Sequence, residues 1–276
     1  MADWLMAPWQ YEFMVKALAM SAFVGLVCGV LSCFVTLRGW ALLGDAVSHA
    51  VTPGVVLAYA LGLPLALGAL LFGLAAVLLM GWIQQQTRLK EDTTIGLVFT
   101  GFFALGLVLI SKTPGQVDFL HILFGNLLGM PAQEMGQTLV IGALVLGVVW
   151  ALKHDLVLLC FDPVHARAIG MDIDRLYYVL LTLLSLTIVV AMQAVGVVLV
   201  VAMLITPGAT AYLLTDRFPA MMGWAATVGV TAGVMGTYAS YYLDASTGGC
   251  IVLAQTLLFV LALVFAPKYG LWRRRV

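Results

Sequence analysis

A histidine and an aspartate lie four residues apart in a largely apolar segment, Leu43-Gly44-Asp45-Ala46-Val47-Ser48-His49-Ala50-Val51-Thr52-Pro53-Gly54. On a helix, residues with this spacing lie on one face, one turn apart. A carboxylate oxygen and an imidazole nitrogen together suit a divalent transition metal. Ionisable groups at membrane depth are energetically expensive and usually mark a pathway or a binding site. Asp45 and His49 are therefore the first candidates for a metal site.

The composition around this segment is that of a membrane protein. The chain has 276 residues, of which 63% are hydrophobic and 9% are charged, and its mean hydropathy is +1.09. Soluble domains are typically about 25% charged. We therefore expect a single transmembrane domain over residues 1–276, in contact with lipid and without a nucleic-acid partner. The spacing Gly25-x-x-x-Gly29 indicates closely packed helices within that domain.

Nine apolar segments approach the roughly 20 residues that span a hydrocarbon core of about 30 Å. They are 13–37, 44–61, 64–83, 94–111, 136–152, 176–192, 195–214, 220–242 and 250–267. Basic residues cluster in alternate connections, which the positive-inside rule places in the cytoplasm. The pattern predicts an all-α fold with an outside N-terminus and an inside C-terminus. One weak segment at the interface would reduce the count to eight, and the apolar stretch 120–130 is too short to span.

Two Thr-Pro-Gly triplets fall inside expected spans, at 52–54 and at 206–208. Proline removes a backbone donor and glycine loosens packing, so we expect both helices to bend or break there. Paired interruptions in the two halves of a transporter point towards its substrate path. The alternative is that both residues are simply common in membrane helices. The candidate gating positions are Pro53, Gly54, Pro207 and Gly208.

The longest connection expected in the cytoplasm, about 153–175, contains a short helix with clear start and stop signals. Asp162 suits the N-cap, Pro163 the first helical position and Gly170 the C′ position. His165 and Arg167 are expected on its exposed surface. Such a helix could dock onto a soluble partner or lie on the lipid headgroups.

The phosphate-binding loop of ATPases is absent, because none of the five lysines follows a glycine. If ATP drives transport, a separate chain must hydrolyse it. The chain itself is expected to be a transport subunit rather than an enzyme, with no tightly bound cofactor.

Asp45 and His49 alone would hold a metal weakly, or they could simply pair with each other. Two copies of their helix across a twofold axis would supply two oxygen and two nitrogen donors, a set that accommodates manganese, iron or zinc. Ser48 and Thr52 add polar groups nearby. Imidazole must be neutral to bind, so binding should weaken in acid.

Three further polar residues lie outside this segment. Asp118 and His121, in an outer connection, could help to collect ions, although interfacial solvation explains them more simply. Gln193 is expected to hydrogen-bond across helices.

The segment 44–54 resembles the signature of the permease subunits of bacterial ABC transporters for zinc, manganese and iron. The resemblance covers most of the chain and is supported by 88–92 and 193–207. It implies a dimeric domain in the inner membrane, formed with a second copy or a related permease. It also implies ATP-binding subunits inside and a metal-binding protein outside. The stretch 121–126 is more similar to the manganese and iron members than to the zinc members.

The resemblance also implies roles for individual residues. Asp45 and His49 would coordinate the metal in transit, and the segment 162–170 would be the coupling helix that docks into the ATPase.

Two alternatives to an ATP-driven permease for manganese or iron stay open. An ion-gradient-driven transporter or channel would use the same ligands without an ATPase. An ABC permease for a bulky metal chelate would tolerate alanine at Asp45 and His49. An intramembrane metalloenzyme is disfavoured, because no H-E-x-x-H motif or second ligand cluster occurs in a span.

Overall fold

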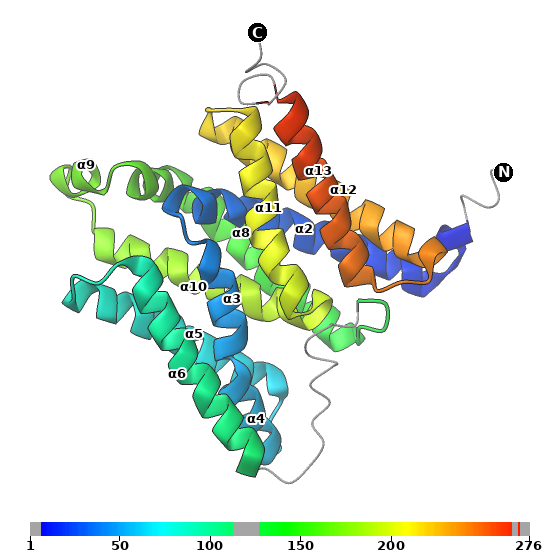
Figure 1. The fold of residues 1–276 in the computed structure, drawn as a ribbon, viewed down its shortest axis with the longest axis horizontal. Coiled ribbons are helices and arrows are strands. Elements are labelled where there is room, and N and C mark those ends of the chain that lie inside the picture. Colours follow the sequence, from blue (N-terminus) through cyan, green and yellow to red (C-terminus); the bar gives the residue numbers. More distant parts are fainter. Residues whose placement is uncertain (1–6, 113–126, 267–269, 271–276) are drawn as a thin grey trace.

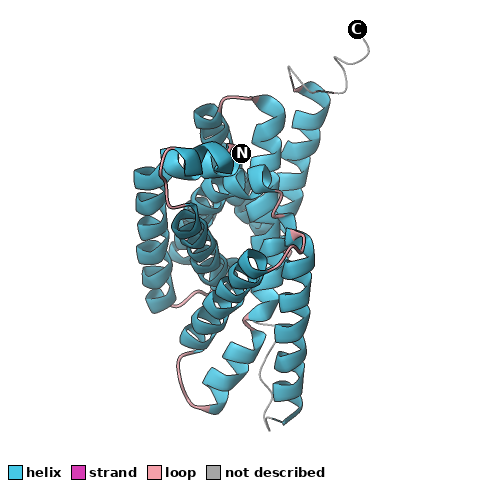
Figure 2. Cartoon of the chain, turned by 90° about the vertical axis from the view of Figure 1, so that its left-hand side faces the viewer, coloured by secondary structure: helices cyan, strands magenta, loops and turns pink. Residues whose placement is uncertain are grey.

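The computed structural model describes residues 7–112, 127–266 and 270. Within these residues the chain consists of helices and connections, without a β-strand (Figure 2). The long helices are α2 (Glu12–Arg38), α5 (Leu65–Gln86), α6 (Glu91–Lys112), α8 (Ala132–Phe161), α10 (Ile173–Val195), α11 (Val197–Leu214), α12 (Phe218–Leu243) and α13 (Thr247–Phe265). The short ones are η1 (Ala7–Gln10), α3 (Ala41–Ala50), α4 (Thr52–Ala60) and α9 (Pro163–Ala168).

Eight stretches among the described residues are long and apolar enough to cross a membrane, with α3 and α4 together forming one of them. The remaining expected span corresponds to α11, which has 18 residues. At 1.5 Å per residue, it rises about 27 Å, slightly less than a hydrocarbon core. The predicted all-α fold of eight to nine spans is therefore confirmed.

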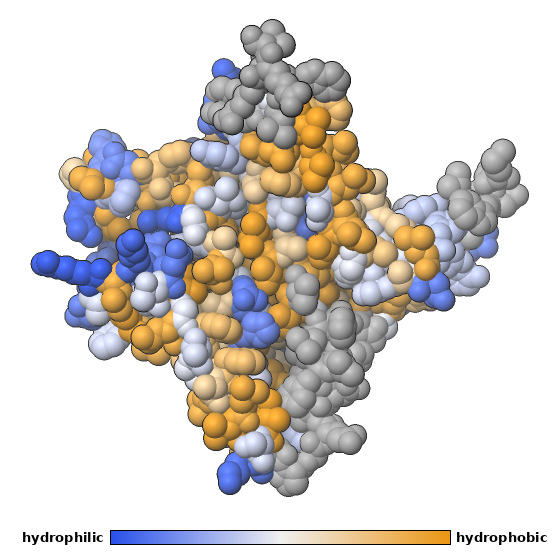
Figure 3. Space-filling model, viewed as in Figure 1, coloured by the Kyte–Doolittle hydropathy of each residue, from blue (hydrophilic) through white to orange (hydrophobic). Residues whose placement is uncertain are grey.

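The molecular surface supports the same conclusion. Hydrophobic residues, in orange, cover most of the face shown in Figure 3, and hydrophilic residues gather on the left near α9. Large apolar side chains such as Trp150 and Leu253 are 73% and 70% exposed. An exposed apolar surface of this extent requires lipid or a partner to cover it. Figure 1 places α9 and the start of α2 on opposite sides of the molecule, as the predicted topology requires.

The centre of the fold is α2, which packs against α8, α11 and α12. Its glycines allow a very close approach to α12. A methyl group on Gly29 would lie 2.6 Å from the carbonyl oxygen of Ala225, and one on Gly25 would overlap the carbonyl of Gly229. The predicted packing role of the Gly25-x-x-x-Gly29 spacing is confirmed.

The two Thr-Pro-Gly triplets behave differently. At the first, α3 ends at Ala50 and α4 begins at Thr52, with Pro53 in its first turn. Gly54 lets α4 approach α5, because a methyl group there would overlap the carbonyl of Gly68.

The second triplet lies inside α11, which continues through Pro207 as one helix. The sequence predicts a bend or a break at Pro207 and Gly208, and α11 does not break there. A methyl group on Gly208 would overlap the carbonyl oxygen of Ser32 and lie 2.6 Å from Oγ1 of Thr36, both on α2. Close packing against a neighbouring helix lets a membrane helix tolerate a missing proline donor. Gly208 thus serves the contact between α11 and α2.

Candidate functional site

Asp45 and His49 come together on α3 as predicted. Nε2 of His49 lies 3.5 Å from Oδ1 of Asp45, and the two side chains are 29% and 51% exposed. Two ligands that each lie about 2.1 Å from a tetrahedral metal are separated by roughly 3.4 Å. The pair therefore has the separation that joint coordination of one ion requires.

The face of α3 that carries this pair is only partly covered by the rest of the chain. Leu42 is 55% exposed and lies one turn before Asp45. The buried residues of α3 are Leu43, Gly44, Ala46, Val47, Ser48 and Ala50. The two candidate ligands therefore lie on a partly exposed stripe of α3, which leaves room for further ligands from outside this chain.

Two phenylalanines on α6 flank the imidazole. The ring centroid of His49 lies 5.8 Å from that of Phe99 and 5.5 Å from that of Phe103. Phe99 and Phe103 stack on each other, with centroids 5.9 Å apart. These rings limit the orientations open to the imidazole and lower the polarity around it. In the sequence, the i, i+4 spacing of the two phenylalanines within the expected span 94–111 indicates that they lie on one face of that helix.

The hydroxyl groups of Ser48 and Thr52 donate hydrogen bonds to backbone carbonyls and do not add ligands to the candidate site. Oγ of Ser48 donates a hydrogen bond to the carbonyl oxygen of Asp45 at 2.8 Å. Oγ1 of Thr52 donates to the carbonyl oxygen of His49 at 2.7 Å. In an uninterrupted helix that carbonyl would accept from residue 53, but Pro53 has no N–H to donate. Thr52 therefore supplies the donor that the helix loses at the break.

The start of α3 is fixed by a cluster of polar and aromatic side chains. Trp40 is 2% exposed and directly precedes α3. Its Nε1 donates a hydrogen bond to Oε2 of Glu91, the first residue of α6, at 2.6 Å. The guanidinium of Arg38 lies 5.4 Å from the Trp40 ring centroid and 5.9 Å from that of Tyr177 on α10. These contacts hold α3 in a fixed position relative to α2, α6 and α10.

The candidate ligands within one chain do not form a complete metal site. No group of three or more His, Cys, Asp or Glu side chains that could hold a metal occurs among the described residues. Asp118 and His121 lie outside the described residues. Within the described residues, each chain therefore brings together two candidate ligands, Asp45 and His49.

The short helix α9 has the caps that the sequence predicts. Oδ1 of Asp162 accepts a hydrogen bond from the backbone N–H of His165 at 2.9 Å. Pro163 is the first helical residue, and Gly170 follows the helix with a φ of 86°. His165 and Arg167 are exposed. Exposed apolar side chains lie beside them: Val164 at 79%, Phe161 at 58% and Ile169 at 57%.

A family model described as the ABC 3 transport family matches residues 10–266. The chain belongs to the ABC 3 transport family. It is 55% identical over 276 residues to the manganese transport system membrane protein MntB of Synechocystis sp., covering 99% of this chain and 90% of that protein. It is 48% identical over 258 residues to the chelated iron transport system membrane protein YfeD of Yersinia pestis, covering 94% and 87%.

A solved structure gives the same assignment. PsaBC from Streptococcus pneumoniae, in complex with a Fab, matches with a TM-score of 0.87 and 39% identity over the whole of both chains. ABC 3 family membership and the eight apolar spans identify a multi-pass protein of the bacterial inner membrane with a transport role. The predicted family is confirmed.

Proposed function

We propose that this chain is the permease subunit of an ATP-driven importer for a divalent transition metal, with manganese or iron as the cargo. The observation that carries the proposal is the partly exposed stripe of α3, on which Asp45 and His49 lie 3.5 Å apart. The names of the relatives, which include manganese and iron transport proteins, support this choice of cargo. Mixed oxygen and nitrogen donors suit both metals, and water can fill the remaining positions.

Two copies of the chain would complete the site. If the α3 stripes face each other across a twofold axis, they supply two carboxylates and two imidazoles to one ion. Four ligands on two separate subunits can part when the subunits move. Movement between the subunits would then weaken coordination and let the ion leave.

Energy for this movement would come from separate ATP-binding subunits that dock on α9. The exposed apolar side chains of α9, together with His165 and Arg167, give it the mixed surface of a docking helix. Closure of the ATP-binding subunits would push α9, and through α8 it would rock the two halves of the membrane domain. An extracytoplasmic metal-binding protein would deliver the ion on the other side.

The test is ATP-dependent uptake of radiolabelled manganese, iron and zinc by vesicles that contain the whole assembly. Asp45→Asn and His49→Gln should each abolish most uptake while assembly with the ATPase is kept. The same chemical changes on α8, His154→Gln and Asp155→Asn, serve as matched controls and should leave uptake near normal. Full uptake in the Asp45 and His49 variants would favour a chelate pathway, and uptake without ATP would favour a gradient-driven transporter.

A further inference from the structure

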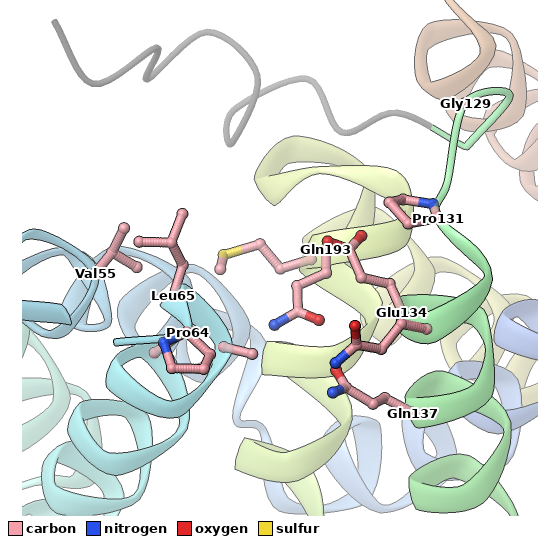
Figure 4. A pocket seen from close by; sticks show the side chains of 12 residues that line it. Val55, Pro64, Leu65, Gly129, Pro131, Glu134, Gln137 and Gln193 are labelled. Carbon is pink, nitrogen blue, oxygen red and sulfur yellow. The ribbon is translucent and has the colours of Figure 1, made fainter. Parts of the chain in front are cut away.

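A second polar site lies beside α4. Trp40, which precedes α3, is at the other end of this pair of helices. A cavity of about 510 Å³ opens between the end of α10 and the starts of α5 and α8, and Val55 of α4 forms part of its wall (Figure 4). These helix ends adjoin the connections from α4 to α5, from α6 to α8 and from α10 to α11, which the basic-residue pattern places outside the cell. The cavity therefore opens towards the side from which an imported ion arrives.

The two walls of this cavity differ in chemistry. Figure 4 shows Val55, Pro64 and Leu65 on one side and Glu134 and Gln137 on the other, with Gln193 between them. The expected hydrogen bond from Gln193 across helices is not found among the described residues. The side chains of Glu134, Gln137 and Gln193 all lack a hydrogen-bond or ion-pair partner within that part of the chain.

The charge in the cavity favours a cation. The carboxylate of Glu134 is half-buried, and none of the described residues that line the cavity is basic. α10 ends at Val195, so Met192 and Gln193 lie in its last turn. The C-terminal end of a helix carries a partial negative charge of about half an elementary unit. The starts of α5 and α8, which also line the cavity, carry the opposite partial charge, so the charge that favours a cation there is the carboxylate of Glu134.

We propose that this cavity is an outer binding site for a hydrated divalent cation, held by Glu134, Gln137 and Gln193. Carboxylate and amide oxygens together with water suit hard ions such as Mn²⁺. Six waters occupy about 180 Å³ at roughly 30 Å³ each, so the cavity has room for an ion with its hydration shell. This inference rests on the proposed metal transport, in which the cavity would be the first site that the ion occupies.

The position of the cavity is consistent with a site that the ion occupies before it reaches Asp45 and His49. Val55 follows His49 by six residues, which corresponds to about 9 Å along a helix. The break between α3 and α4 lies between them. An ion released from the cavity would thus have a short path along this broken helix to the Asp45 and His49 pair.

The test is titration of Mn²⁺ into the purified assembly in nanodiscs, without the external binding protein, with the EPR signal of free Mn²⁺ as the readout. An Asp45→Asn background removes the transit site and leaves the outer site to be measured alone. In that background, Glu134→Gln should weaken the remaining Mn²⁺ binding by about tenfold, because the ion loses its charged ligand. Glu12→Gln is the matched control, since Glu12 lies on α2, is 83% exposed and pairs with Lys16.

The outcomes separate this site from the proposed function. Equal Mn²⁺ binding in Glu134→Gln and Glu12→Gln would overturn the outer site. The outer site would also be overturned if Glu134→Gln slows uptake from the loaded binding protein but leaves Mn²⁺ binding unchanged. Glu134 would then help the binding protein to dock on the permease. A different result would contradict the proposed function. In that case the variant that carries only Asp45→Asn would take up metal normally.

Discussion

His49 has three neighbours that decide what it can bind. The Asp45 carboxylate lies 3.5 Å away, and the rings of Phe99 and Phe103 flank the imidazole. The carboxylate favours a metal cation beside the imidazole. The rings restrict the imidazole to a few orientations. Because an imidazole nitrogen that carries a proton cannot bind a metal, protons would compete with the proposed metal for His49.

This competition predicts the direction of the pH dependence. Metal binding requires neutral imidazole, so binding by the assembled permease should fall as the pH is lowered from about 8 to about 5. The measurement is equilibrium binding of radiolabelled manganese at each pH. In His49→Gln the residual binding should lose most of this dependence. An unchanged slope in that variant would show that another group controls it.

A second residue-scale prediction concerns Thr52. Thr52→Val keeps the shape but removes the donor to the carbonyl oxygen of His49, which Pro53 cannot replace. We expect a loss of about 1–3 kcal/mol in the free energy of unfolding, the usual cost of an unsatisfied polar group. Thermal unfolding in detergent measures the change.

Thr100→Val on α6 is the matched control for Thr52→Val. Oγ1 of Thr100 donates to the carbonyl oxygen of Gly96 at 2.7 Å, in the interior of a continuous helix. The Gly96 carbonyl keeps its backbone partner there, so the change should be nearly neutral. Equal destabilisation by the two variants would contradict the special role of Thr52 at the break.

At the scale of single elements, α9 and α11 show what local sequence signals can and cannot predict. The capping residues Asp162 and Gly170 act on neighbours within a few positions, so the sequence predicts α9 correctly. The effect of Pro207 depends instead on α2, which supports α11 from the side. The proline itself carries no information about that contact, so the sequence alone could not tell whether α11 breaks at Pro207 or continues.

The caps of α9 yield a prediction about coupling. Asp162→Ala removes the N-cap hydrogen bond and should destabilise α9 by about 1 kcal/mol. Gly170→Val forces a β-branched residue into a positive φ, which is strained. Both variants should reduce metal uptake per ATP hydrolysed while leaving Mn²⁺ binding to the permease intact.

Asp172→Ala is the control for the α9 variants, because Asp172 caps α10 through the N–H of Arg175 at 3.1 Å. It removes the same kind of bond from a long membrane helix. Uptake per ATP should change less than in Asp162→Ala. If all three variants behave alike, α9 has no particular role in coupling.

At the scale of the whole molecule, the partly exposed stripe of α3 with Asp45 and His49 is the reason to propose a second subunit, which would supply the missing ligands. The sequence predicts the spans, the family and the adjacency of Asp45 and His49, because these follow from composition, motif and helical periodicity. It does not predict Phe99 and Phe103 beside His49, the bond from Trp40 to Glu91, or the outer cavity at Glu134. Each of these depends on how distant helices pack.

The twofold arrangement predicts a cross-link through α3. Leu42→Cys places a thiol on the stripe, one turn before Asp45, and a short thiol-specific cross-linker should join two copies of the chain. Of the four native cysteines, Cys28, Cys33 and Cys250 are buried and Cys160 is partly buried, so the cross-link is compared with that of the natural chain, which keeps Cys160. Val140→Cys is the control, since Val140 is 68% exposed on α8, which packs against α2 and α10. Efficient cross-linking through Val140 but not Leu42 would contradict the arrangement.

Pulsed EPR of Mn²⁺ bound to the assembled transporter tests the central claim, metal coordination by Asp45 and His49, most directly. The hyperfine coupling of a directly bound imidazole ¹⁴N should be present in the natural chain. It should disappear in His49→Gln and persist in His154→Gln and Glu134→Gln. A nitrogen coupling that survives in His49→Gln, or that is absent from the natural chain, would contradict metal coordination by His49.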